Sequence, residues 1–271
     1  MFVFRKESLP SDPVFPSDLK KLGYFINEND QIRMISHPLE KFLYKINAND
    51  RYNEMQKEAM NNCIRDIVLS RLHNLGLQTL RLPIGASPKS QHVPILVSSS
   101  LGSQSRVIVV FGEPAQDLGI WAYRAMEQGL NFGSAVNFAK AVVGDSKESK
   151  DANNSKTTRK SGLVLANPGQ LVWYSHGERA VSLPTWHAIP RRYAVDPPMK
   201  MSYRNKIPGN ENWQDHITYV FEEVLAKSLS ETAKIDIIGL AEGGLGAIRY
   251  LAEHCRYTHL QTSYYIVGLR C

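Results

Sequence analysis

The sequence predicts an α/β fold, with one mainly parallel sheet that carries helices on both faces and an N-terminal hairpin. Two observations predict it. Short apolar runs of strand length alternate with longer segments of helical periodicity, the pattern of a parallel sheet covered on both faces. In addition, the apolar run Ile235–Leu240 is followed at once by glycines and then by a helical pattern that reaches Leu251.

The length of 271 residues fits one large α/β domain, so we assign residues 1–271 to a single domain. Hydrophobic residues make up 43% of the chain and charged residues 21%, which is the balance of a soluble globular protein. No apolar run approaches the ~20 residues that span a bilayer, and the first residues do not have the pattern of a signal peptide. We therefore expect no membrane contact and no secretion.

Cysteine usage and charge restrict the kinds of site that are expected. Cys63, Cys255 and Cys271 are odd in number and have no C-x-x-C spacing, so the sequence predicts no disulfide framework, no metal site and no cofactor. The same usage fits a reducing compartment. The net charge of +6 and the pI near 9.1 permit contact with nucleic acid or an acidic partner without requiring either.

Residues 1–46 are predicted to form an N-terminal arm and the hairpin. Three prolines, at positions 10, 13 and 16, favour an extended arm. Two short β-prone runs, at 24–26 and 31–35, then flank a turn rich in Asn and Asp, which is the pattern of a hairpin.

A long helix and three strands are predicted next. Asn49 or Asp50 can cap a helix that continues to about Leu75, where Gly76 ends it. Apolar residues recur along it at spacings of three and four, which predicts one amphipathic face. Strand-like segments follow at 77–82, 95–98 and 106–111.

The middle of the chain contains a polar insertion. Residues 133–143 have a helical pattern, whereas residues 145–160 contain one alanine as their only hydrophobic residue and are predicted to be a flexible surface insertion. Its five cations against three acids permit contact with RNA, although a solvated loop is the simpler interpretation. A strand is expected at 163–166, and then a long proline-rich connection without regular structure to about Pro208.

The last part of the chain returns to the helix and strand pattern. A strong helical stripe begins near Asn210 and includes Trp213, Phe221 and Leu229. The strand and helix of 235–251 follow, with the helix expected to reach about Cys255. A final strand is expected at 264–269.

The glycine turn has the layout of a nucleophile elbow in an α/β-hydrolase sheet. The elbow pattern G-x-S-x-G lies over Gly239-Leu240-Ala241-Glu242-Gly243 and is followed by Gly244. Ala241 occupies the nucleophile position, and alanine has no hydroxyl to activate. The sequence therefore predicts a hydrolase-like fold without hydrolase activity, in which the elbow is vestigial and Glu242 is a structural or surface carboxylate.

Two further catalytic groups are also expected to be missing. The loop expected to supply oxyanion donors is Phe111-Gly112-Glu113-Pro114, in which Pro114 has no N–H and Glu113 carries a negative charge. A triad histidine is expected after the last strand, but the sequence ends at Cys271. We expect His216, His254 and His259 to be structural or surface residues. The competing interpretation, a hydrolase that uses Ser175 or Ser182 as an unconventional nucleophile, has no motif to support it.

Four stretches give the chain a resemblance to the argonaute-binding protein 2 domain family, an α/β-hydrolase-like group. They are Phe15–Asn29, Val107–Phe111 with Gly119–Arg124, Ala166–Pro168, and Ile207–Val220. The family has His-Ser-x-Gly-Gly at the elbow, where this chain has Leu240-Ala241-Glu242-Gly243-Gly244. The family has His-Gly-Ser-Gly in the loop after the earlier strand, where this chain has Phe111-Gly112-Glu113-Pro114. Both departures remove catalytic features, so no enzymatic role is carried over.

The resemblance implies a non-catalytic subunit of an Argonaute small-interfering-RNA (siRNA) complex that acts in RNA-mediated gene silencing, histone methylation and heterochromatin assembly. The implied partners are Argonaute and a second Argonaute-binding subunit, with siRNA contacted indirectly, in the nucleus and cytoplasm. The alternative that the family offers is a chromatin-associated module acting with a class II histone deacetylase.

The segment Trp186–Lys206 is the predicted partner-binding surface. It mixes aromatic side chains with arginines, residue types that are enriched at the energetic centres of protein interfaces. The candidates are Trp186, Arg191, Arg192, Tyr193, Tyr203 and Arg204. The competing interpretation is that this segment only covers the inactive pocket.

Overall fold

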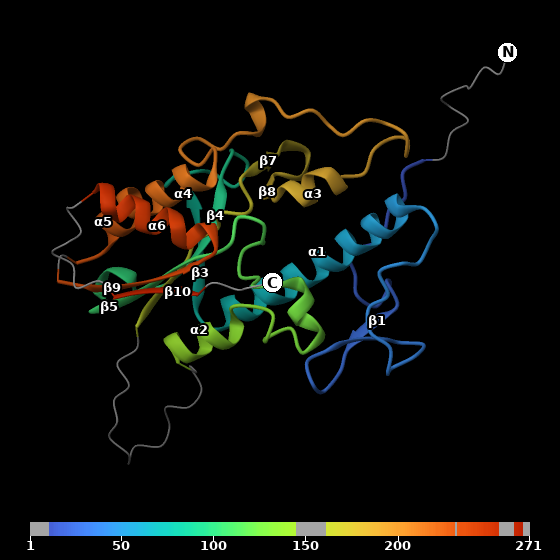
Figure 1. The fold of residues 1–271 in the computed structure, drawn as a ribbon, viewed down its shortest axis with the longest axis horizontal. Helices are drawn as coiled ribbons and strands as arrows, with labels where there is room; N and C mark the ends of the chain where they lie inside the picture. Colours follow the sequence, from blue (N-terminus) through green and yellow to red (C-terminus); the bar gives the residue numbers. More distant parts are fainter. Residues whose placement is uncertain (1–10, 145–160, 231, 255–262, 268–271) are drawn as a thin grey trace.

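The computed structural model describes residues 11–144, 161–230, 232–254 and 263–267, and it has an α/β architecture built on one central sheet. Figure 1 shows this sheet with helices on either side of it. In the described residues the sheet contains six strands: β3 (Leu77–Leu82), β4 (Val93–Ser98), β5 (Arg106–Phe111), β6 (Gly162–Leu165), β9 (Lys234–Leu240) and β10 (Ser263–Val267).

The strand order across the sheet is β10-β9-β5-β6-β4-β3. The first four strands of that order are parallel to one another, whereas β4 runs antiparallel to both β6 and β3. The sheet is therefore mixed, because one strand opposes its two neighbours. The antiparallel strands β3 and β4 are joined by residues 83–92 without a helix, whereas longer connections that include helices join the parallel strands.

Helices cover both faces of the sheet (Figure 1). One face packs on α1 (Asp50–Asn74) and α2 (Val136–Val143), and the other packs on α4 (Trp213–Tyr219) and α6 (Glu242–Glu253). Side chains along β5 alternate between these two cores, with Val109 and Phe111 in the core below α4 and α6 and Val110 in the core below α1. This alternation explains why β5 consists of consecutive apolar residues.

The helix predicted from Asn49 is confirmed. The Asn49 side chain caps α1 by accepting a hydrogen bond of 2.9 Å from the backbone N–H of Arg51. Gly76 follows the last turn with a φ of 91°, a conformation that suits glycine. Val68 and Leu72 on the buried face have no exposed surface, and together with Met60 and Ile64 they pack this helix into one of the two cores.

Strands β1 (Tyr24–Ile26) and β2 (Ile32–Met34) pair antiparallel beside α1. The Asn27 side chain shapes the turn between them by accepting hydrogen bonds from the backbone N–H groups of Asn29 and Gln31. At the tip of the turn, Asp30 forms an ion pair of 2.7 Å with Arg71. The pair of strands is thereby fixed to the C-terminal end of α1.

The prediction of an unstructured connection from about 170 to 208 is wrong. This segment contains β7 (Val172–Tyr174), β8 (Arg179–Val181) and α3 (Leu183–Ala188), and β7 and β8 form a small antiparallel sheet. Three-residue strands are too short to give a periodic pattern, which is why the sequence did not indicate them. The insertion expected at 145–160 lies outside the described residues.

Short helical segments complete the described structure. The helix predicted from Asn210 begins as α4 and continues as a π-helical segment, η6 (Val220–Leu225), and the short α5 (Ala226–Ser228). Four 3₁₀ turns lie in connections: η2 (Leu101–Ser103), η3 (Tyr123–Glu127), η4 (Ser175–Gly177) and η5 (Tyr203–Asn205). Of these, η3 lies in the long connection between β5 and α2.

Candidate functional site

The turn between β9 and α6 has the strained backbone of a strand-to-helix elbow. Ala241 occupies it with a φ of 48° and a ψ of −126°. A positive φ is uncommon for a residue with a side chain, and among the described residues only Asp30, Glu178 and Ala241 combine a positive φ with a residue other than glycine. Ala241 and Glu242 are exposed, so the turn presents a methyl group and a carboxylate to its surroundings.

Glycines let this turn pack closely against its neighbours. A Cβ on Gly239 would lie 2.8 Å from the backbone nitrogen of Gly244, and so β9 and α6 can approach only because both residues lack one. A Cβ on Gly243 would meet the carbonyl oxygens of Gly112 and Phe111, the latter at 2.7 Å. Gly239, Gly243 and Gly244 therefore have packing roles that a residue with a Cβ cannot fill without moving the backbone.

Ala241 and Glu242 contribute no nucleophile to the elbow. Ala241 has no titratable or hydrogen-bonding side chain. Glu242 lies in the first turn of α6, where a carboxylate stabilises the positive end of the helix dipole. Neither residue supplies the activated hydroxyl that acyl transfer from this position requires.

The loop after β5 fills the space at the carboxyl ends of β5 and β6. In open α/β sheets this edge is where ligands bind. Here Gln116 folds back by donating its backbone N–H to the Glu113 carbonyl, and the Gln116 carbonyl abuts Gly169 beyond the end of β6. The cavity that remains between these segments has a volume of about 20 Å³, which is room for about one water molecule.

His216 is a buried structural residue, as predicted. Its Nε2 accepts a hydrogen bond of 3.0 Å from the backbone N–H of Asn167, and its Nδ1 donates one of 2.7 Å to Asn210 Oδ1. Because a backbone N–H can only donate, the proton lies on Nδ1 and the ring is neutral. Burial lowers the pKa of His216 to about 3. The side chain joins α4 to the end of β6, and it has no position left for catalysis.

The other candidates for catalytic chemistry are also engaged or isolated. The His254 ring stacks on Tyr250 at 4.3 Å at the end of α6, and His259 lies outside the described residues. The Ser182 hydroxyl is buried and hydrogen-bonded to Thr185 at 3.1 Å. Ser175 is exposed in η4. Within the described ranges, no hydrogen bond joins either serine hydroxyl to a histidine.

The predicted partner-binding segment has an inner part that holds the fold together. Trp186 is 5% exposed, and its indole N–H donates to the Met199 carbonyl at 3.1 Å. The Arg191 backbone N–H donates to Asp12, and its guanidinium donates to the Asp196 carbonyl. These two candidates are therefore committed to contacts within the chain.

The outer part of the same segment is exposed. Arg192 lies over the Tyr193 ring at 5.3 Å. Farther along, Tyr203 is 76% exposed, and its hydroxyl accepts a hydrogen bond of 3.3 Å from the Arg204 guanidinium. The structure thus leaves Arg192, Tyr203 and Arg204 as the accessible candidates for partner contact.

Asp12 connects the N-terminal arm, α1 and the end of α3. It is 4% exposed and forms a two-pronged pair with the Arg51 guanidinium, which also donates to the carbonyls of His187 and Ile189. Burial raises the pKa of Asp12, but the hydrogen bonds and charges of Arg51 and Arg191 lower it more, so the pKa lies below its ordinary value.

A second buried ion cluster was not foreseen from the sequence. Arg65 on α1 pairs with Glu58 at 2.5 Å and with Asp117 at 2.7 Å, and it also contacts the Tyr123 hydroxyl. Burial lowers the pKa of Arg65, but Tyr123 and the two carboxylates raise it more, so the guanidinium stays charged. The cluster anchors α1 to the loop after β5. Its members are too far apart in the sequence to form a motif.

Neither a metal cluster nor a membrane span is found in the described part of the chain. No three His, Cys, Asp or Glu side chains come close enough there to hold a metal ion, and no helix is both long and apolar enough to cross a bilayer.

Comparison with known proteins identifies the family. The family model of the Arb2 domain matches residues 15–263, a range that includes the central sheet up to the start of β10, the elbow and the partner-binding segment. Comparisons with curated proteins and with solved structures gave no match. Because the family model covers most of the chain, the protein belongs to the Arb2 domain family, the argonaute-binding protein 2 domains, a family associated with Argonaute-related gene silencing.

Proposed function

We propose that the protein is a non-catalytic subunit of an Argonaute siRNA complex, and that it acts in RNA-mediated gene silencing and heterochromatin assembly in the nucleus and cytoplasm. Family membership supports the Argonaute partnership. The observation that carries the non-catalytic part is Ala241, which has the backbone of a nucleophile elbow but ends in a methyl group. In this proposal the elbow is a remnant of a hydrolase framework.

The surroundings of Ala241 support the same proposal. An oxyanion site needs N–H donors aimed at the position where negative charge develops. Here Gly243 packs against the carbonyl oxygens of Phe111 and Gly112, which are acceptors and would repel an oxyanion. The loop after β5 offers Glu113, which carries a negative charge, and Pro114, which has no N–H to donate.

The exposed part of the segment Trp186–Lys206 is the proposed contact with the Argonaute complex, which consists of Argonaute and a second Argonaute-binding subunit. Arginine and tyrosine side chains of this kind form the energetic centres of many interfaces. Tyr203 presents most of its ring to solvent beside Arg204, and Arg192 lies over Tyr193. In this proposal, siRNA is held by the partners, and this chain contacts it only indirectly.

Point substitutions test this surface better than deletion does, because a deletion would remove Trp186 and Arg191 and the contact with Asp12. The variant Arg192→Ala/Tyr203→Ala/Arg204→Ala changes exposed or partly exposed side chains only. We expect it to keep the thermal stability of the wild type and to lose Argonaute from pull-downs. The control Lys89→Ala/Arg249→Ala alters two exposed cations outside the segment. Equal Argonaute recovery with all three proteins would refute this surface.

A serine-reactive fluorophosphonate probe tests the non-catalytic proposal directly. We expect no labelling of the wild-type protein, because Ser182 is buried against Thr185 and, within the described residues, no hydrogen bond joins the Ser175 hydroxyl to a histidine. Labelling that disappears in Ser175→Ala or Ser182→Ala would instead establish a hydrolase with an unconventional nucleophile.

A further inference from the structure

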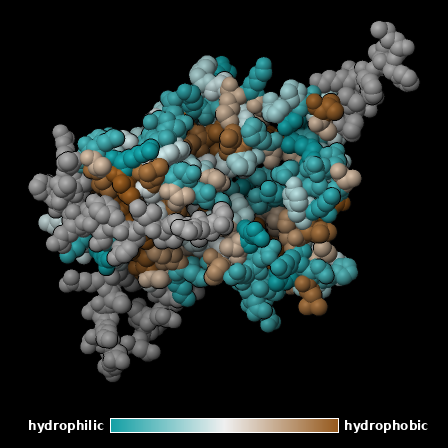
Figure 2. Space-filling view, viewed as in Figure 1, coloured by the Kyte–Doolittle hydropathy of each residue, from teal (hydrophilic) through white to brown (hydrophobic). Residues whose placement is uncertain are grey.

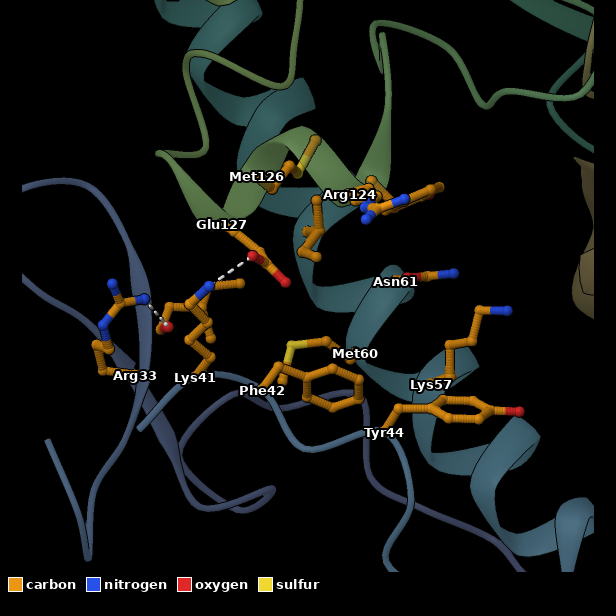
Figure 3. Close-up of a pocket in the computed structure, with 13 residues that line it drawn as sticks. Arg33, Lys41, Phe42, Tyr44, Lys57, Met60, Asn61, Arg124, Met126 and Glu127 are labelled. Carbon is orange, nitrogen blue, oxygen red and sulfur yellow. Dashed lines mark hydrogen bonds and ion pairs between the residues drawn. The ribbon is translucent and has the colours of Figure 1, made fainter. Parts of the chain in front are cut away.

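A groove lies between β2 with the segment that follows it, α1 and η3. We call it the α1–η3 groove and show it in Figure 3. Its volume is about 230 Å³, and its floor is apolar, with Ile32, Phe42, Met60, Ile64 and Met126. It shares no lining residue with the elbow or with the segment Trp186–Lys206. It is therefore a separate site.

Four cations surround this apolar floor. Arg33 and Lys41 lie at one end of the groove in Figure 3, Lys57 lies at the other, and Arg124 lies on the side of η3. Phe42 and Met60 lie between the two ends. Because each end carries positive charge and the middle is apolar, the groove has the charge pattern of a receptor for an anionic, amphipathic segment.

The carboxylates nearby do not neutralise these cations. Glu127 is bonded to Lys41 at 2.7 Å, and the charges of Arg124 and Arg33 also lower its pKa after the dominant effect of Lys41. Three cations therefore act on one carboxylate. Both members of the Lys41–Glu127 pair are more than half exposed, and surface pairs of this kind contribute little to stability because water and salt screen them. A ligand carboxylate can replace Glu127 at little cost.

Among the described residues, Arg33 and Lys57 do not have a full ionic partner of their own. The guanidinium of Arg33 donates to the Ile32 carbonyl and to the Gln31 amide, which are neutral acceptors. Lys57 lies 3.7 Å from Glu54, whose other oxygen accepts a hydrogen bond from the Tyr44 hydroxyl. The groove and its edge thus hold four cations against two carboxylates that are already hydrogen-bonded.

The size and lining of the groove favour one apolar side chain over a larger ligand. Its volume is below the ~300–1,000 Å³ of typical small-molecule sites. Met60 and Met126 in the floor are flexible side chains that adapt to the shape of a partner group. Nucleic acid is less suited, because bases bind by stacking on free aromatic faces. The Phe42 ring already packs on Tyr24, and Lys57 covers Tyr44.

We propose that the α1–η3 groove binds an acidic peptide segment of a protein partner, with one apolar side chain on the floor and carboxylates on both sides of it. The segment between β2 and α1 also exposes Ile35, Leu39 and Leu43, and Figure 2 shows hydrophobic side chains among the hydrophilic ones over this part of the molecule. The proposed peptide binding is independent of the proposed Argonaute function, because it can be measured with the purified chain and a peptide alone.

A random-sequence peptide display library, panned against the full chain, tests the proposal. We expect enrichment of peptides in which acidic residues flank one apolar residue. In fluorescence anisotropy, the variant Lys57→Glu/Arg124→Glu should bind the enriched peptide at least about tenfold more weakly than the wild type. The control Lys89→Glu/Arg249→Glu has the same change in net charge outside the groove and should bind within about twofold of the wild type. All four substituted side chains are exposed, so thermal unfolding should be equal.

Three results would overturn the proposal. One is a display experiment in which the enriched peptides lack acidic flanks or are enriched equally by the Lys57→Glu/Arg124→Glu variant. Another is equal binding of the enriched peptide by the groove variant and the control variant. The third is an oligouridine RNA that displaces the peptide and binds more tightly than it, which would assign the groove to nucleic acid.

Discussion

Adding one methyl group to the elbow glycines should destabilise the protein strongly, because the new atom would meet backbone rather than a movable side chain. In Gly239→Ala the Cβ would lie 2.8 Å from the Gly244 nitrogen, and in Gly243→Ala it would lie 2.7 Å from the Phe111 carbonyl oxygen. Ordinary van der Waals contacts of a Cβ are 3.4–4 Å. Relief therefore requires β9, α6 or the end of β5 to move.

The magnitude follows from the cost of overpacking. Inserting a methyl group into a packed site costs ~1–3 kcal/mol, and movement of backbone is at the upper end of that range. A gain of ~0.4–1 kcal/mol from the more restricted unfolded chain offsets part of it. We expect a net loss of roughly 2 kcal/mol for each variant and a fall in Tm of roughly 4–8 °C.

Thermal unfolding followed by circular dichroism measures this effect, and Gly112→Ala is the matched control. A Cβ on Gly112 would meet no atom within 4 Å, so the same substitution there should change the free energy of unfolding by less than about 0.5 kcal/mol. If all three variants have the same Tm as the wild type, the elbow glycines are not required for the close packing of β9 against α6, and this explanation of the turn is wrong.

Two further predictions concern buried titratable groups. Acidification from pH 6.5 to 5 should cost about 1.6 kcal/mol through His216, because the unfolded chain takes up a proton near pH 6.5 whereas burial lowers the folded pKa to about 3. Denaturant titrations of His216→Gln should lack this loss, and an equal loss in both proteins would refute it. Asp12→Ala should cost roughly 3 kcal/mol at pH 7, because it leaves the mostly buried Arg51 unpaired, whereas Asp66→Ala on the exposed face of α1 should be near neutral. Since the folded pKa of Asp12 lies below 3.8, its contribution to the free energy of unfolding is present above that pH and is lost on further acidification. If the difference in free energy of unfolding between the wild type and Asp12→Ala is the same at every pH, this assignment is wrong.

The elements with local signals were predictable. Asn49 and Gly76 mark the limits of α1 because capping and a positive φ depend on single residues. The strand and helix on either side of Ala241 were predictable because an apolar run and small residues stand next to each other. By contrast, β7 and β8 have three residues each, and their pairing leaves no pattern in so short a run.

The parts of the candidate sites that depend on distant contacts were not predictable. Trp186 and Arg191 were expected at a partner interface, yet the structure commits them to Met199, Asp196 and Asp12. Asp12 and Arg191 are 179 residues apart, and such a contact has no sequence signature. The α1–η3 groove was missed for the same reason, because its cations come from separate elements.

Affinity purification of the tagged full chain from its own cells, followed by quantitative mass spectrometry, tests whether the protein is a subunit of an Argonaute complex. We expect Argonaute and a second Argonaute-binding subunit to be recovered together with the tagged chain. Recovery of a histone deacetylase without Argonaute would refute this assignment and would favour a chromatin module that acts beside a deacetylase.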